Sequence, residues 1–124
     1  MTRRVLRVNE LLRDELSFLL QRKVHDPRLQ RLVTITRVSV SKDLSRAKVF
    51  VSVMGSEEEK VQVFQGLKAA SPFLRRNLGP RLSLRHIPQL SFQRDDSLEE
   101  GARVLELMNR VASSSQDDQT LEER

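Results

Sequence analysis

The chain has 124 residues, enough for one domain with a single modest core, since a chain of this size buries about two-thirds of its unfolded surface. It contains no cysteine and two histidines far apart in sequence, which excludes disulfides and cysteine metal sites, so we expect neither a metal nor a cofactor. No apolar run approaches the roughly 20 residues that span a bilayer, and the first residues lack a signal peptide's apolar centre. We therefore expect a soluble, cytoplasmic protein.

The net charge of +5 is distributed unevenly along the chain. From Lys60 to Arg94 there are seven basic residues and no acidic one, whereas residues 113–124 carry four acids and a single arginine. A basic body attracts polyanions, and arginine suits bidentate contacts with phosphate better than lysine does. Nucleic acid is therefore the favoured class of partner, and an ordinary solvated surface is the alternative.

The first part of the chain predicts a helix followed by two paired strands. In RRVLRVNELLRDELSFLLQRK, apolar residues recur every three or four positions from Val5 to Leu19, and Pro27 then breaks the pattern. VTITRVSV alternates but changes phase near Thr36 and Arg37, which indicates a β-bulge or a twist, while RAKVFVSVM alternates strictly. The short polar connection SKDLS predicts that the two strands form an antiparallel hairpin.

The next segment predicts a helix that is interrupted by Pro72. Ser56 and Glu59 have the spacing of a capping box at its start. The residue before a proline is disfavoured in helical conformation, whereas serine is a good N-cap and proline is favoured at the first helical position. The sequence thus predicts a kink at Ala70, Ser71 and Pro72, followed by a new short helix over residues 72–78.

The last segment predicts a strand and a final helix. LSLRHIPQLSFQRD alternates, and Pro88 restricts this strand to a sheet edge or a bulge. A second capping-box spacing, which starts at Ser97, precedes a helix whose Leu98, Leu105 and Met108 are expected to face inward.

These elements predict an α+β protein, a three-stranded sheet with helices packed on one face. Residues 1–112 would form this domain. Residues 113–124 are polar and charged, which is typical of a disordered acidic tail.

Three sequence motifs occur in the order DPRL, VTITRVSVSKDLSRAKVFVSVMG and FLRRNLGPRLSLRHIPQLSFQRDDSLEEG. In this order they resemble the ribosome-binding factor A family of bacterial small-subunit assembly factors, over about residues 3–112. The resemblance implies a KH-like domain of the second topological type, with a kinked helix pair in place of the usual G-x-x-G loop. Many members of the family read Ala-x-Gly at the kink, where this chain has Ala70, Ser71 and Pro72.

The same resemblance implies a function in ribosome assembly. It implies a protein without enzymatic activity that binds immature small (30S) ribosomal subunits near the 5′-terminal helix of 16S rRNA. It further implies that the protein assists late 16S rRNA maturation, leaves before translation and supports growth in the cold. We expect a monomer with no membrane or small-molecule partner.

Candidate RNA-binding residues lie in several parts of the chain. A helix starting at Ser71 would present unpaired N–H groups to a phosphate, followed within one turn by Arg75 and Arg76. The other candidates are Arg81 and Arg85 near the last strand, Lys42, Arg46 and Lys48 in or beside the hairpin, and Arg3, Arg4 and Arg7 in the first helix. The alternative for each of them is a solvated basic surface.

Two further choices remain open from the sequence. Phe50 opposes the valines of its strand, so it either stacks on a base or, more simply, packs with Met54 under the final helix. The alternative function is that of a general basic, nucleoid-type protein, although no groove-reading element is evident. A hydrolase or nuclease is disfavoured, because the sequence has no P-loop, metal-ligand cluster or catalytic triad.

Overall fold

A computed structural model describes residues 3–29, 33–82 and 84–123. The elements, in chain order, are α1 (Arg3–Arg22), η1 (Pro27–Leu29), β1 (Val33–Val40), β2 (Arg46–Val53), α2 (Glu57–Leu78), η2 (Gly79–Arg81), β3 (Gln89–Arg94) and α3 (Ser97–Glu123). The described residues thus form an α+β fold, as the sequence predicted. None of the helices within them is both long and apolar enough to cross a membrane.

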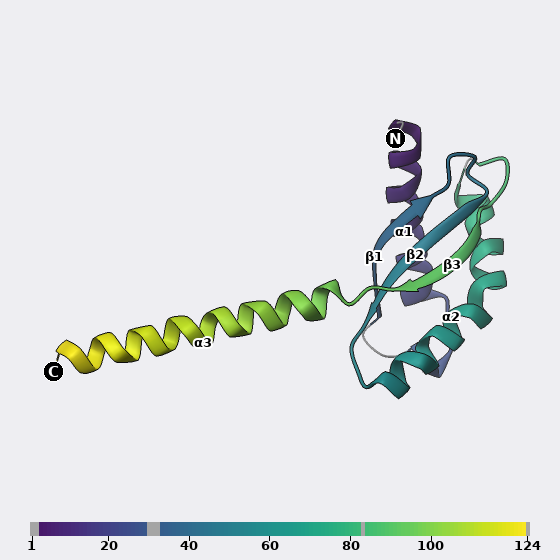
Figure 1. Ribbon diagram of the computed structural model, residues 1–124. Helices are drawn as coiled ribbons and strands as arrows, with labels where there is room; N and C mark the ends of the chain where they lie inside the picture. The colour runs from purple at the N-terminus through teal and green to yellow at the C-terminus, as the bar shows by residue number, and fades with distance from the viewer. Residues whose placement is uncertain (1–2, 30–32, 83, 124) are drawn as a thin grey trace.

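The strands form one sheet in the order β1-β2-β3 (Figure 1). β1 pairs antiparallel with β2 through the short turn, which confirms the predicted hairpin, and β2 pairs parallel with β3. The register of the hairpin shifts between Ile35 and Arg37. The change of phase in the sequence therefore marked a real β-bulge, with Thr36 as the extra residue.

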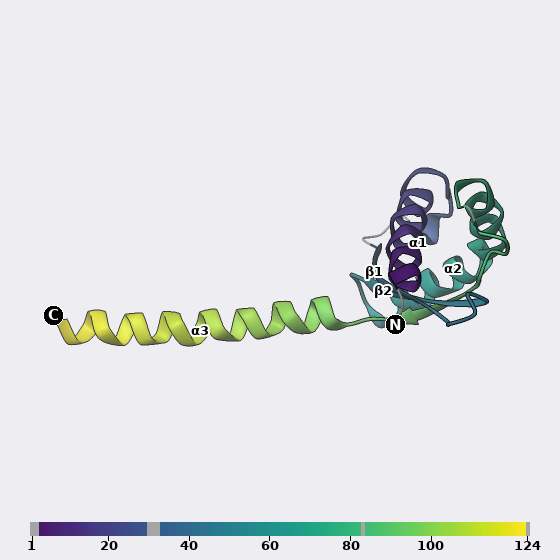
Figure 2. The ribbon, with the colours of Figure 1, turned by 90° about the horizontal axis from the view of Figure 1, so that it is seen from above.

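The core lies between the sheet and two helices. Figure 2 shows α1 and α2 on the same face of the sheet. The predicted apolar face of α1 is confirmed, since Val5, Val8, Leu12, Leu16 and Leu19 are all buried. The inward residues of β2 are also as predicted: Ala47, Val49, Val51 and Val53. Each fully buried leucine or valine contributes about 1.5–3 kcal/mol relative to an exposed one.

Helix α2 corrects the prediction of two separate helices. It runs without interruption from Glu57 to Leu78, so Ser71 is a helical residue and not an N-cap. Figure 1 shows that its axis changes direction partway along its length. Pro72 lies inside the helix and explains the bend, because it has no N–H for the carbonyl of Lys68 and its ring crowds that carbonyl.

The helix continues through Pro72 because both of its halves are held by the core. Leu67 before the proline and Leu74 and Leu78 after it are all fully buried. Tertiary packing therefore outweighs the local cost of the proline, which sequence pattern alone could not show. Helix α2 ends at Leu78, before Gly79 and Pro80, as predicted.

We expect Ser71→Ala to leave the free energy of unfolding unchanged or to raise it by up to about 0.5 kcal/mol, because alanine is the better residue inside a helix. Ser56→Ala is the matched control. Ser56 is the real cap of α2, where its hydroxyl accepts a bond from the Glu59 amide at 3.2 Å. Loss of this cap in Ser56→Ala should lower the free energy of unfolding by about 1 kcal/mol. Chemical unfolding measures the free energy of unfolding of both variants. A larger loss of stability for Ser71→Ala than for Ser56→Ala would restore the two-helix interpretation.

The last strand also differs from the prediction. β3 begins only at Gln89, after Pro88, whereas the sequence predicted a strand from Leu82. β3 is an edge strand, as the proline required. Arg75 crosses to the segment before it, donating from Nε to the Pro88 carbonyl at 3.2 Å and from Nη2 to the Ile87 carbonyl at 3.1 Å.

Helix α3 extends away from the sheet (Figures 1 and 2). The prediction that its apolar residues face inward is therefore wrong: Leu98, Leu105 and Met108 are 53%, 62% and 61% exposed. An amphipathic pattern shows that a helix has an apolar face, but it does not identify the surface that covers this face. The predicted boundary between a domain at residues 1–112 and a disordered tail at 113–124 lies within α3 and stays a prediction.

Candidate nucleic-acid interface

Basic side chains from three separate segments meet at one end of the molecule. Figure 1 shows the start of α1, the β1–β2 turn and the segment leading into β3 at the same end. The Val40 amide donates to Asn9 Oδ1 at 2.9 Å, and the Gln89 amide donates to the Ser45 carbonyl at 2.9 Å. These bonds join the three segments. We call the exposed cations here the basic end: Arg3, Arg4, Arg7, Lys42, Arg46 and Arg85.

The β1–β2 turn holds its cations on a closed hydrogen-bonded framework. The Asp43 carboxylate accepts bonds from the Ser41 hydroxyl at 2.7 Å, the Ser45 hydroxyl at 2.8 Å and the Ser45 amide at 3.1 Å. These bonds favour the ionised carboxylate and lower the pKa of Asp43 to about 2. Lys42 and Arg46 therefore flank a fixed turn and remain exposed.

The cations of the basic end make no ion pair with another residue that the structure describes. Arg3, Arg4 and Arg7 lie near the start of α1, which has no acidic residue in its first turn. Positive charge is unfavourable at a helix N-terminus, because the helix dipole is positive there. The arrangement does not serve the stability of α1, and it leaves these charges available to an anion.

The other predicted residues are placed differently. Arg76 is exposed on α2 and Lys48 is exposed on the sheet face opposite the helices. Arg75 is bonded to the segment before β3, as described above. Arg81 is paired within the fold, since its Nη1 lies 3.0 Å from Glu15 Oε2 and its guanidinium lies 4.5 Å from the centre of the Phe18 ring.

Ser71 does not form the predicted anion site, because it lies within continuous helix and the first N–H groups of α2 belong to the segment after Ser56. Arg75 and Arg81 each have a structural role that the sequence could not reveal. Both contacts join residues more than ten positions apart in the chain, and only the fold brings them together.

The sequence interpretation missed Arg37. Its guanidinium lies over the Phe50 ring, 4.2 Å from the ring centre, on the exposed face of the sheet. Phe50 is partly buried, and the prediction that it packs under the final helix is wrong because α3 extends away from the sheet (Figure 2). The signal was present: once the bulge at Thr36 is allowed for, the register of the hairpin places Arg37 opposite Phe50.

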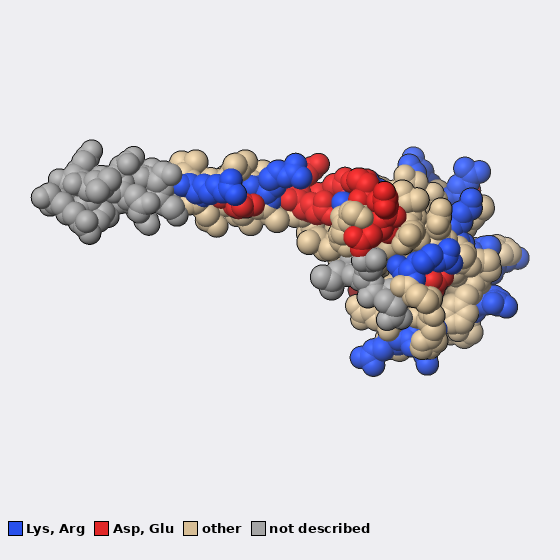
Figure 3. All heavy atoms as spheres, turned by 90° about the horizontal axis from the view of Figure 1, so that it is seen from below, with Lys and Arg blue, Asp and Glu red and all other residues tan. Residues whose placement is uncertain are grey.

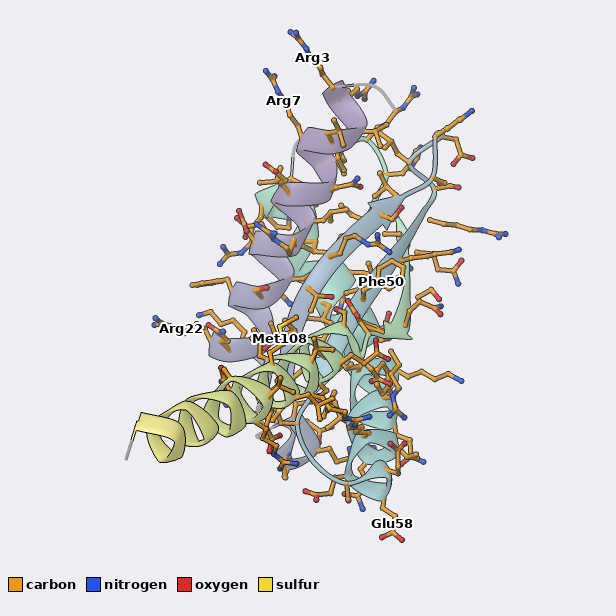
Figure 4. All side chains as sticks on the ribbon, turned by 60° about the vertical axis from the view of Figure 1, so that its left-hand side comes forward. Arg3, Arg7, Arg22, Phe50, Glu58 and Met108 are labelled. Carbon is orange, nitrogen blue, oxygen red and sulfur yellow. The ribbon has the colours of Figure 1, made fainter. Side chains whose placement is uncertain are left out.

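The opposite end of the molecule is acidic. Figure 3 shows acidic side chains gathered where α3 leaves the body, and Figure 4 shows Glu58 at the end away from Arg3 and Arg7. Two cations near this patch, Lys60 and Arg94, are paired with acids, whereas Arg22 and Lys23 at the end of α1 are exposed and make no ion pair among the described residues. Lys60, whose side chain is 5% exposed, lies 2.8 Å from Glu99, and Arg94 donates to Glu57 at 2.7 Å and to Asp96 at 2.8 Å.

The junction between β3 and α3 depends on Asp95. Its carboxylate accepts bonds from the Thr36 hydroxyl at 2.5 Å and the Ser97 amide at 2.9 Å, so it caps the start of α3. The sequence predicted Ser97 as the N-cap, but Ser97 is the first residue of α3, so the N-cap position falls one residue earlier, on Asp96. The bonds from Thr36 and then Ser97 lower the pKa of Asp95 to about 2.

This lowered pKa predicts a pH dependence of stability. Because the folded-state pKa is below the usual value of about 4, the contribution of Asp95 is present above that value and is lost as the pH falls through about 2. We expect Asp95→Asn to unfold more easily than the parent at pH 7, with a difference that shrinks between about pH 4 and pH 2. Chemical unfolding across this range measures it, and a constant difference would contradict the assignment.

The fold and this distribution of charge define a class of protein: a KH-like α+β domain with one basic end suited to a polyanion and an acidic patch where α3 leaves the body. Comparison with known proteins narrows the class. The family model for ribosome-binding factor A matches residues 4–108.

The relatives agree with the family model. The chain is 46% identical to ribosome-binding factor A of Acetivibrio thermocellus, with 90% of this chain and 91% of the relative covered. It is also 46% identical to the protein of that name from Thermosynechococcus vestitus, over 97% of this chain and 96% of the relative. The chain therefore belongs to the ribosome-binding factor A family.

Solved structures agree with this assignment. The crystal structure of ribosome-binding factor A from Thermus thermophilus superposes with a TM-score of 0.65 at 30% identity, covering 73% of this chain and 93% of that one. A Thermus thermophilus homology model, fitted into the cryo-electron-microscopy map of a 30S–RbfA complex, gives a TM-score of 0.57 at 28% identity. It covers 71% of this chain and 91% of that one.

Proposed function

We propose that this protein is a ribosome biogenesis factor that binds immature 30S subunits through phosphate contacts of its basic end. The cluster of exposed cations carries the proposal: six of them gather at the basic end with no ion pair among the described residues, whereas Lys60 and Arg94, near the start of α3, are paired with acids. Membership of the family supports a ribosomal partner, and the Thermus relative has been placed in a 30S complex.

The finer proposal is that the protein binds near the 5′-terminal helix of 16S rRNA and assists late maturation without catalysing a reaction. It acts as a monomer in the cytoplasm, requires no cofactor and leaves the subunit before translation. Because phosphate contacts release counterions, affinity for the subunit falls steeply as salt rises. A protein of this kind is needed most in the cold, where misfolded rRNA rearranges slowly.

Sedimentation of cell extract tests the proposal. We expect the protein to migrate with free small subunits and to be absent from polysomes, and we expect cells lacking it to accumulate precursor 16S rRNA, more so in the cold. Migration with the nucleoid, together with normal 16S rRNA in the deletion strain, would favour the general nucleic-acid-binding alternative and overturn the proposal.

A further inference from the structure

The exposed sheet face carries a stacked pair of side chains beside a hollow. β2 points its valines into the core and Phe50 to the other face, where the register of the hairpin sets Arg37 opposite it. The Arg37 guanidinium covers the Phe50 ring at 4.2 Å. In Figure 4, Phe50 lies over the middle of the sheet, between the end marked by Arg3 and the end marked by Glu58.

The bulge that places Arg37 here is held firmly. The Thr36 hydroxyl lies 3.2 Å from the Phe50 carbonyl and 2.5 Å from Asp95 Oδ2, so the extra residue is fixed to both neighbouring segments. A bulge re-aims the side chains that follow it. The position of the guanidinium over the ring is therefore set by the backbone.

The hollow beside this pair has the size and the chemistry of a nucleotide site. It measures about 540 Å³ and lies between α1 and β1, with Arg13, Arg37, Lys48 and Phe50 among its lining residues. That volume falls within the range of about 300–1,000 Å³ usual for small-ligand sites. Glu10 is the single acid among the described residues that line it, against three cations, of which Arg13 also lies 3.6 Å from Asp14 in an exposed ion pair.

Polar side chains add hydrogen-bonding groups to the same hollow. Asn9 uses Oδ1 to accept from the Val40 amide at 2.9 Å, which directs its amide nitrogen elsewhere, and Ser39 lies opposite Lys48 in the register. Unpaired RNA bases stack on aromatic rings and on the planes of arginine guanidinium groups, with hydrogen bonds to their edges. The hollow supplies both a stacking plane and polar groups.

We propose that this hollow binds one unpaired nucleotide of the ribosomal RNA, whose base stacks on the outer face of the Arg37 guanidinium. Phe50 supports the guanidinium from beneath and is a positioning residue. Lys48 and Arg13 contact the phosphate of the same nucleotide, and the chain of phosphates continues toward the basic end. This inference rests on the proposed function and adds to it a base contact, where the basic end supplies phosphate contacts alone.

Replacing Arg37 with lysine separates stacking from charge. Lysine keeps the positive charge but lacks the planar group. We expect Arg37→Lys to weaken binding to purified immature small subunits by about tenfold, which is within the range measured for loss of one stacked base. The slope of log Kd against log salt should stay the same, because no phosphate contact has been removed.

Matched variants complete the experiment. Arg46→Lys, at the basic end, keeps the charge of a residue assigned to phosphate alone and should bind within about twofold of the parent. Phe50→Leu removes the support and should weaken binding in the same direction as Arg37→Lys, whereas Phe50→Tyr keeps the ring and the affinity. Chemical unfolding of each variant confirms that the folded protein is being compared.

The outcomes distinguish the two proposals. If the parent binds and Arg37→Lys and Phe50→Leu bind within about twofold of it, the nucleotide site is wrong and the proposed function stands. If Arg37→Lys weakens binding and also makes log Kd less dependent on log salt, Arg37 is a phosphate contact and the stacking site is also overturned. If the parent itself does not bind immature subunits, the proposed function fails and the inference fails with it.

Discussion

Reversing four charges of the basic end is expected to abolish binding to immature small subunits. The variant carries glutamate at Arg4, Arg7, Lys42 and Arg46. Each reversal removes a phosphate contact and adds repulsion, so Kd should rise on the order of a hundredfold or more at physiological salt. Arg75 and Arg81 are left in place, because their bonds to Ile87, Pro88 and Glu15 would confuse a loss of binding with a loss of folding.

A control with the same change of net charge locates the effect. It carries glutamate at Arg22, Lys23, Lys68 and Arg103, all exposed and outside the basic end. It should keep most of the binding, although glutamate in the last turn of α1 is unfavourable to the helix dipole. The variant with four reversed charges at the basic end should have a free energy of unfolding within about 1 kcal/mol of that of the parent. Equal loss of binding by both variants would show that net charge, and not this surface, sets affinity.

The largest expected effect on stability is that of Leu74→Ala. Leu74 is fully buried, two positions after Pro72, and holds the second half of α2 against the core. Truncation to alanine leaves a cavity and should cost about 2–5 kcal/mol, a large part of the stability of a small domain. Arg75 follows directly and is bonded to the segment before β3, which carries Arg85 of the basic end, so subunit affinity should fall as well if this half of the helix loosens.

The same substitution at an exposed leucine is the control. Leu105 on α3 is 62% exposed, so Leu105→Ala should change the free energy of unfolding by less than about 0.5 kcal/mol. Urea unfolding of both variants measures the contrast. A loss of 2 kcal/mol or more at Leu105 would mean that α3 packs on a surface in solution, as its apolar pattern predicted.

The fold was predictable where local pattern and tertiary packing agree. The face of α1, the hairpin and its bulge follow from periodicity and from turn chemistry, because the same residues that form each element also bury it. Local pattern and tertiary packing disagree at Pro72, where local preference favours a break in the helix and the buried Leu67 and Leu74 favour its continuation. The prediction of a strand before Pro88 was wrong for a similar reason. Alternating apolar residues show that a segment could form a strand, but they do not identify another strand with which it pairs.

The cations of the candidate site could be listed from the sequence, but their arrangement could not, and their RNA contacts stay a prediction. Charge counting identified the cations at Arg3, Lys42 and Arg46, but it could not separate these from Arg81, which the fold pairs with Glu15. Arg37 was missed because its contact with Phe50 follows only when the predicted hairpin register is combined with the bulge at Thr36, a step that the sequence analysis did not take. Contacts between distant segments decide which cations are available, and a single sequence does not contain them.

Site-specific photo-crosslinking tests the central claim most directly. A benzophenone amino acid replaces Lys42 at the basic end in one variant and Glu58 at the acidic end in the other, and each is irradiated with immature small subunits. Both positions are exposed, so probe accessibility is matched. We predict crosslinks to precursor 16S rRNA from position 42 and none from position 58. Crosslinks to the RNA from position 58, with none from position 42, would contradict the assignment of the RNA-binding surface to the basic end.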